Sequence, residues 1–298
     1  MYLFLVSIIS LSALIFAFYY LKDAYKHRKE YPNASWVPLS GIGFVANFFD
    51  TLGIGSFATT TAFYKFTKLV DDRVIPGTLN TGLCMPVVAQ SLLFLSAVQV
   101  EPVTLISMMA SATLGAVLGA GVVSKLPVNK IRLGLGSALL LVAMGILAGL
   151  LNLFPSGGDA FGLTGVKLIV AIAGNFILGS LMTIGVGLYA PCMALTYALG
   201  MNPLAAFPIM TGSCALLQPW ASLKFVKEKA YHPKAAFGLT AAGIFGVLIA
   251  FFIVKSLPLT ILKWVIVVVI VYTSVTMFRS ITKRKAAAAP IETGRSGS

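Results

Sequence analysis

Apolar stretches long enough to cross a lipid bilayer recur along most of the chain, and this limits the possible folds more than any other feature. About 20 consecutive apolar residues span the hydrocarbon core as an α-helix. The short alternating segments of a transmembrane β-barrel are not evident. The sequence therefore predicts an all-α polytopic membrane protein. Full spans are expected near residues 2–21, 75–98, 103–123, 133–151, 203–223, 235–254 and 260–279.

The composition and the charge pattern agree with this class. Only 10% of the residues are charged, whereas soluble domains carry about 25%. Of the 22 Lys and Arg residues, 19 fall in short blocks at 22–37, 64–74, 124–133, 224–234 and 279–298. Because cytoplasmic loops are rich in Lys and Arg, these blocks predict an outside N-terminus and a cytoplasmic C-terminus. Blocks this short and separated do not indicate a nucleic-acid partner, despite the net charge of +13.

Two further apolar stretches carry Gly-x-Gly near their middle. Residues 38–64 lie between two basic blocks, so this stretch is expected to start and end in the cytoplasm. Residues 166–200 lie between two non-basic connections and are expected to start and end outside. Each stretch is therefore predicted to be a broken, re-entrant helical hairpin. An arm of about 13 residues is roughly 20 Å long, which passes the middle of a core about 30 Å thick.

The two halves of the chain are related in sequence. The matching segments lie 130 to 132 residues apart, and a nearly constant offset indicates an internal repeat. With opposite faces for the two hairpins, it predicts an inverted-topology repeat, each unit a hairpin plus three spans, after one extra N-terminal helix. The matches are "TLGIGSFATTTA" (51–62) with "TIGVGLYAPCMA" (183–194), "TGLC" (81–84) with "TGSC" (211–214), and "SKLP" (124–127) with "KSLP" (255–258).

This organisation divides the chain into five parts. They are an N-terminal helix with a cytoplasmic linker, repeat 1, an external linker, repeat 2 and a cytoplasmic tail. The first span is not interpreted as a cleaved signal peptide, because no basic residue precedes its apolar core. The small, polar tail is interpreted as disordered or foreign to the native chain. The boundaries are 1–37, 38–151, 152–165, 166–279 and 280–298.

The glycine pairs predict an anion site. Gly53 and Gly55 allow the backbone to turn, and the second arm then begins with unpaired N–H groups. A helix start inside the membrane must face a polar partner, and its dipole favours an anion. Gly185 and Gly187 repeat the pattern, so two converging helix starts would hold one small anion. No Lys or Arg falls in the predicted bilayer centre. The alternative is that Gly-x-Gly only permits tight helix packing.

The hairpin motifs resemble those of a known family. "GIGFVANFFDTLGIG" (41–55), its weaker copy "AGNFILGSLMTIGVG" (173–187) and the duplicated helices look like the TauE/SafE sulfite exporter family, also called sulfite/organosulfonate transporters. The resemblance covers most of residues 38–279. It implies transport of sulfite or a small organosulfonate, often out of the cell, across the bacterial cytoplasmic (inner) membrane. Many members carry a denser glycine run where Ser56 and Phe57 follow Gly55 here.

Asp50 is the only acidic residue within a long apolar run. Intramembrane acids are usually functional, so Asp50 is a candidate proton site or gate. A second interpretation makes Asp50 a cap for the N–H groups at the start of the second arm. Met182 occupies the equivalent position in the second hairpin. Both interpretations of Asp50 stay open at this point.

Further polar side chains are candidates for the anion pathway. Hydroxyl groups follow both breaks and can donate to an anion. On the helix after the second hairpin, three residues at i, i+3 and i+7 share one face, and two residues match them in the first half. The candidates after the breaks are Ser56, Thr59 and Tyr189, and those on the helix faces are Thr81, Cys84, Thr211, Cys214 and Gln218.

Several other functions find little support in the sequence. The three cysteines lie inside spans without CxxC spacing or a nearby histidine, so no metal site or cofactor is expected. No Walker-type motif indicates ATP as the energy source. An enzyme acting on lipid phosphates would need more intramembrane acids or a nucleophile–base pair. The expected function is therefore a non-enzymatic secondary carrier that exports a small sulfur-containing anion. The alternative is a proton-coupled uptake carrier or a channel for another small anion.

The predicted topology can be tested directly. Single cysteines at 64–74 and 224–234 should react with an impermeant thiol reagent only from the cytoplasmic side, and cysteines at 152–165 only from outside. Labelling is read in intact cells and in inverted membrane vesicles. Labelling of the 64–74 loop from outside would contradict the inverted-repeat prediction.

Overall fold

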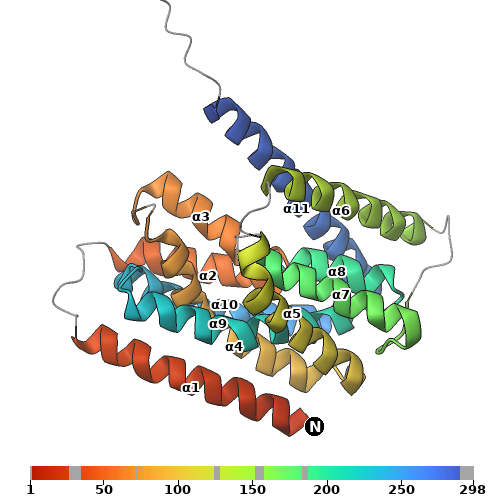
Figure 1. Cartoon of the computed structure of the whole chain (residues 1–298), viewed down its shortest axis with the longest axis horizontal. Coiled ribbons are helices and arrows are strands. Elements are labelled where there is room, and N and C mark those ends of the chain that lie inside the picture. Colours follow the sequence, from red (N-terminus) through yellow and green to blue (C-terminus); the bar gives the residue numbers. More distant parts are fainter. Residues whose placement is uncertain are drawn as a thin grey trace, which may run out of the picture.

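The protein is helical throughout the described part of a computed structural model, where an isolated bridge between Ala160 and Met201 is the only β-type pairing (Figure 1). The structure describes residues 2–26, 35–71, 73–123, 128–151, 158–182 and 187–288. The helices are α1 (Tyr2–Lys26), α2 (Trp36–Thr51), α3 (Ser56–Thr67), α4 (Ile75–Ala97), α5 (Pro102–Val123), α6 (Val128–Leu150), α7 (Gly165–Met182), α8 (Tyr189–Ala198), η2 (Pro203–Ala205), α9 (Ala206–Lys227), α10 (Pro233–Ser256) and α11 (Leu259–Ala288).

Six helices in the described residues are long and apolar enough to cross a membrane, namely α1, α4, α6, α7, α10 and α11. This confirms the predicted all-helical class, and the fold is that of a multi-pass membrane protein. Helix α5 adds a shorter apolar stretch, Pro102–Leu118. Helix α9, expected as a span at 203–223, is not among the six. Its polar residues, such as Ser213 and Gln218, are buried against other helices, so this helix does not depend on an apolar surface.

Helices α4 and α9 form the centre of the bundle. They pack directly against each other, and 72% of the apolar stretch of α4 is buried, compared with 29% for α6. Near one end of this contact, Phe94 stacks on Phe207 with ring centroids 4.7 Å apart. Figure 1 shows α1 along one edge of the bundle and the α6–α11 pair along the opposite edge. The central pair therefore lies between the two halves of the chain.

Both glycine-containing stretches are broken as predicted, but the arms are unequal. The first hairpin has arms of 16 and 12 residues, and the second has arms of 18 and 10 residues. About 13 residues per arm had been expected from an even division. Each break lies beyond the middle because the first arm has a long helix partner to pack against. Residues 183–186, in the second break, lie outside the described part.

The first break needs glycine at two positions. Gly53 has a φ of 98° and Gly55 a φ of 81°, which are left-handed conformations that L side chains rarely adopt. The Gly53 N–H donates to the Asp50 carbonyl at 2.8 Å, and the Ile54 N–H donates to the Phe49 carbonyl at 3.1 Å. These bonds close the end of α2, as in other helix C-termini that finish on glycine.

The first arm of each hairpin packs on a helix from the other half of the chain. Helix α2 packs on α10, and α7 packs on α5. Close backbone approach makes both contacts possible. A Cβ on Gly43 would lie 2.6 Å from the Gly238 carbonyl oxygen, and a Cβ on Gly179 would meet the Ala112 carbonyl oxygen. The glycines of both motifs therefore have a packing role, which the alternative interpretation of Gly-x-Gly had foreseen only for the breaks.

An asparagine joins each of these pairs in a matching way. Asn47 on α2 donates to the Leu239 carbonyl of α10 at 3.4 Å. Asn175 on α7 donates to the Met108 carbonyl of α5 at 2.7 Å. Leu239 and Met108 lie 131 residues apart, which is the offset of the sequence repeat. Buried amides that bond across helices hold the two hairpins in corresponding positions.

The two linking segments are partly ordered by the same bundle. In the expected external linker, Leu163 donates its N–H to Thr104 Oγ1 at 2.9 Å, and the Asn202 N–H donates to the Ala160 carbonyl at 2.8 Å. Residues 152–157 of that linker lie outside the described part. Helix α11 continues to Ala288, past the expected boundary at residue 279, and residues 289–298 are not described.

Replacing Gly179 with valine should destabilise the protein by about 1–3 kcal/mol, because the new side chain collides with backbone that cannot rotate away. Gly145→Val is the matched control, since Gly145 is exposed on α6 with open space around it. Thermal unfolding in detergent measures the difference. Equal melting temperatures for the two variants would contradict the close α5–α7 contact.

Candidate functional site

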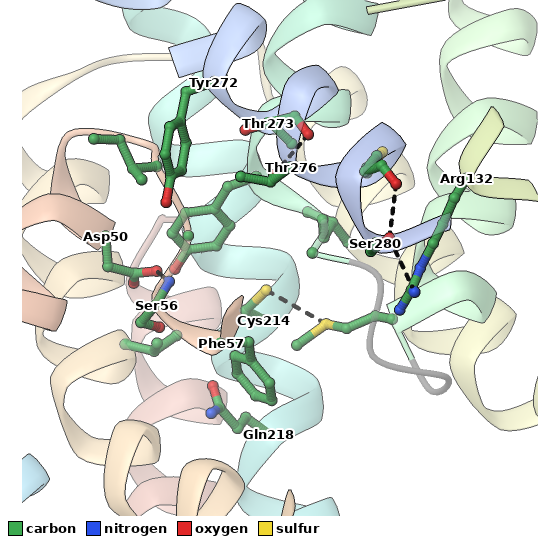
Figure 2. Close-up of a pocket in the computed structure, with 18 residues that line it drawn as sticks. Asp50, Ser56, Phe57, Arg132, Cys214, Gln218, Tyr272, Thr273, Thr276 and Ser280 are labelled. Atoms are coloured by element: carbon green, nitrogen blue, oxygen red, sulfur yellow. Dashed lines mark hydrogen bonds between the residues drawn. The ribbon is translucent and has the colours of Figure 1, made fainter. Parts of the chain in front are cut away.

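A cavity of about 160 Å³ lies where the two helix breaks meet (Figure 2). The break between α2 and α3 and the end of the break before α8 contribute to its wall, with α4, α6, α9 and α11 completing it. The lining residues are Asp50, Ile54, Gly55, Ser56, Phe57, Val87, Arg132, Met182, Gly187, Leu188, Tyr189, Cys214, Gln218, Tyr272, Thr273, Thr276, Met277 and Ser280. Segments distant in sequence therefore converge on one space.

The cavity brings together about half of the candidate residues from the sequence. The candidates on its wall are Asp50, Gly55, Ser56, Gly187, Tyr189, Cys214 and Gln218. The described candidates that do not line it are Gly53, Thr59, Thr81, Cys84 and Thr211. Gly185 lies outside the described residues.

The candidates away from the wall have other contacts. Thr59 donates to the Ser56 carbonyl at 2.9 Å, and Thr211 donates to the Phe207 carbonyl at 2.7 Å, so both hydroxyls bond within their own helix. Thr81 and Cys84 are fully buried on α4. Gly53 faces Met193, whose Cε would lie 2.5 Å from an added Cβ. The matching face of the first half therefore packs into the bundle rather than onto the cavity.

Asp50 accepts hydrogen bonds at both carboxylate oxygens. The Ser56 N–H donates to Oδ1 at 2.5 Å, and Gln90 Nε2 donates to Oδ2 at 2.9 Å. The first bond is a cap on the start of α3, although Asp50 lies six residues before Ser56 rather than at the usual capping position. Both partners are donors, so the arrangement suits an ionised carboxylate. A proton-coupling role for Asp50 stays a prediction.

Gln90 connects the two breaks. Its Oε1 accepts from the Tyr189 hydroxyl at 3.0 Å while its Nε2 donates to Asp50. Asp50, Gln90 and Tyr189 are 3%, 0% and 5% exposed, so the bonds form away from water. A continuous chain of bonds therefore runs from the start of α3 through α4 to the start of α8. Sequence reasoning missed Gln90, since a single glutamine in an apolar helix carries no spacing signal.

The second break differs chemically from the first. Met182 takes the position equivalent to Asp50, and its sulfur accepts from Cys214 Sγ at 3.7 Å. A thioether is a weak acceptor and carries no charge. The wall therefore has a carboxylate at one break and sulfur atoms beside the other, as Figure 2 shows.

Sequence reasoning also missed the wall formed by α6 and α11. Thr273, Thr276 and Ser280 lie at i, i+3 and i+7 on α11, and Arg132 of α6 donates to Ser280 Oγ at 3.1 Å. The same i, i+3, i+7 pattern had been noted on α9, and applied to α11 it would have found the three hydroxyls. Arg132 had been counted in the basic block 124–133, which hid its contact with the cavity.

Within the described residues, no group of three or more His, Cys, Asp and Glu side chains is arranged to hold a metal ion. No protein-family model, curated protein or solved structure matches the chain. The resemblance to the TauE/SafE family therefore rests on the hairpin motifs and stays a prediction.

The hydrogen-bonded chain predicts energetic coupling between Gln90 and Tyr189. Gln90→Leu should destabilise the protein by about 1.5–3 kcal/mol, because it removes a donor to a buried carboxylate. In the double variant with Tyr189→Phe, the two effects should differ from their sum by at least about 0.5 kcal/mol. Denaturant or thermal unfolding of the four proteins in detergent provides the cycle. Strict additivity would show that the two side chains do not act together.

Proposed function

We propose that this chain is a secondary transporter that carries a small anion across the membrane by alternating access. One observation carries the proposal, namely that residues of both helix breaks line the same cavity. Broken helices that meet near the middle of the membrane form the substrate sites of many secondary transporters. The order of elements matches that architecture, with a hairpin and three helices in each half of the chain after α1.

The packing of the helices supports an inverted repeat. The pairs α2–α10 and α7–α5 are equivalent under the 131-residue offset, and so are the two asparagine bonds across them. Helices of one half therefore hold the hairpin of the other, which is expected when a pseudo-twofold axis relates the halves. The basic blocks then place the N-terminus outside and the C-terminus in the cytoplasm.

Backbone dipoles favour an anion in this cavity. Helices α3 and α8 begin at Ser56 and Tyr189, both on the wall, and the start of a helix carries partial positive charge. A Cβ on Gly55 or Gly187 would find nothing within 4 Å, so open space lies beside both helix starts. The negative charge of Asp50 is offset by its two donors, which reduces its repulsion of a bound anion.

The resemblance to the TauE/SafE family makes sulfite or a small organosulfonate the proposed substrate, and a bacterial inner membrane the proposed location. Export is favoured energetically, because an inside-negative potential supplies about 2.3 kcal/mol per charge for each 100 mV. Uptake of an anion would need coupled cations, and Asp50 is the one carboxylate among the described residues of the cavity wall. The proposal includes no cofactor and no catalytic step.

Gly187→Leu should abolish anion binding and transport while leaving the fold intact. The leucine side chain projects into the cavity, and Gly187 is not among the positive-φ glycines, so the backbone accepts it. Gly55 is less suitable, since any side chain there is strained at φ 81°. Gly145→Leu is the matched control on the exposed side of α6.

Calorimetry and proteoliposome flux with sulfite, ethanesulfonate, sulfate, phosphate and acetate test this. The wild type and Gly145→Leu should bind at least one of these anions, and Gly187→Leu should bind none. Binding of the same anion at equal strength by Gly187→Leu would exclude the cavity as the site. Failure of the wild type to bind or move any of them would contradict the proposed function.

A further inference from the structure

The cavity wall contains one guanidinium group among the described residues, and it lies away from Asp50. Arg132 comes from the first turns of α6 and is partly exposed. Figure 2 shows Asp50 at one side of the cavity and Arg132 at the other, with the α11 hydroxyls between their levels. The wall is therefore electrically polarised, with the carboxylate beside the first break and the cation beside α11.

Helix α11 orients the guanidinium toward the cavity. Arg132 Nη1 donates to Ser280 Oγ at 3.1 Å, and Ser280 in turn donates to the Met277 carbonyl at 2.7 Å. One turn earlier, Thr276 donates to the Thr273 carbonyl at 2.8 Å. Hydroxyls that bond within their own helix can rotate to donate to a ligand. Arg132 thus has an anchored position beside two hydroxyl groups on the wall.

The side of the membrane follows from the basic blocks. Arg132 belongs to the block 124–133 and Ser280 to the block 279–298, both assigned to the cytoplasm. An anion that approaches from the cytoplasm would therefore meet Arg132 before it reaches the helix starts of α3 and α8. A positive group in a low-dielectric channel raises the local concentration of anions.

We infer that Arg132 is the charged ligand that captures the substrate at the cytoplasmic side of the cavity, together with Ser280 and Thr276. This rests on the proposed function. The planar guanidinium presents a fork of N–H donors that matches two oxygen atoms of one group. The arrangement therefore selects polyatomic oxyanions, such as sulfonates or carboxylates, over halide ions of the same charge.

The charge of Arg132 can be measured without knowing the substrate. Thr276→Cys is introduced into a background in which Cys84, Cys192 and Cys214 are serine. Its reaction rates with an anionic sulfonatoethyl and a cationic trimethylammonioethyl thiosulfonate reagent are then compared. Arg132→Gln should lower the anionic-to-cationic rate ratio by about tenfold, and Arg132→Lys should keep it, because a lysine retains the charge. An unchanged ratio in Arg132→Gln would overturn the inference.

Anion binding provides the second readout, with sulfite, ethanesulfonate and chloride as probes. Arg132→Gln should weaken oxyanion binding by about tenfold or more, and Arg132→Lys should weaken it less while admitting chloride more readily. Ser280→Ala keeps the charge and should cost about threefold, which covers the case of an Arg132→Gln protein that does not fold.

The outcomes separate the two proposals. Wild-type-like oxyanion binding in both Arg132→Gln and Ser280→Ala overturns the role of Arg132 and leaves the proposed function standing. Equal affinity of the wild type for chloride and ethanesulfonate overturns the selection of oxyanions alone. A wild type that binds neither sulfite nor ethanesulfonate overturns the proposed function and the inference together.

Discussion

The need to satisfy backbone polar groups at a helix break inside the membrane governs the rest of this structure. Water is scarce at that depth, so each freed N–H needs a partner from the protein or a polar cavity. At the first break, Asp50 supplies that partner to the Ser56 N–H. The carboxylate is then itself a buried charge, and Gln90 compensates it from α4. One cap thus requires a second helix, and Gln90 extends the requirement to Tyr189 of the other hairpin.

Close helix contacts hold the breaks in place. Each first arm is clamped to a helix of the opposite half through glycines that let backbones touch and through an asparagine that bonds across. In a membrane, where lipid is as apolar as leucine, such packing and hydrogen bonding replace the hydrophobic effect as the force between helices. Movement of one half against the other would therefore carry the opposite hairpin with it.

The two breaks are equivalent in position but not in chemistry. The first has a carboxylate and the second a thioether, and Arg132 has no counterpart on the described part of the wall. A symmetric scaffold thus encloses an asymmetric cavity. This asymmetry gives the cavity one negative and one positive side, which a direction of transport can use.

The sequence by itself determined the helical class, the two breaks and the matched halves, because apolar length, glycine pairs and the 131-residue offset are local or periodic signals. It also marked Asp50, Ser56, Gly187 and Cys214 as candidates that line the cavity. Only the tertiary structure decided that Thr81 and Cys84 pack inward, and that Gln90 and Arg132 join the site. Those outcomes depend on the rotation of each helix about its axis and on which helix faces it. Contacts between residues far apart in the chain fix both, and no local pattern records them.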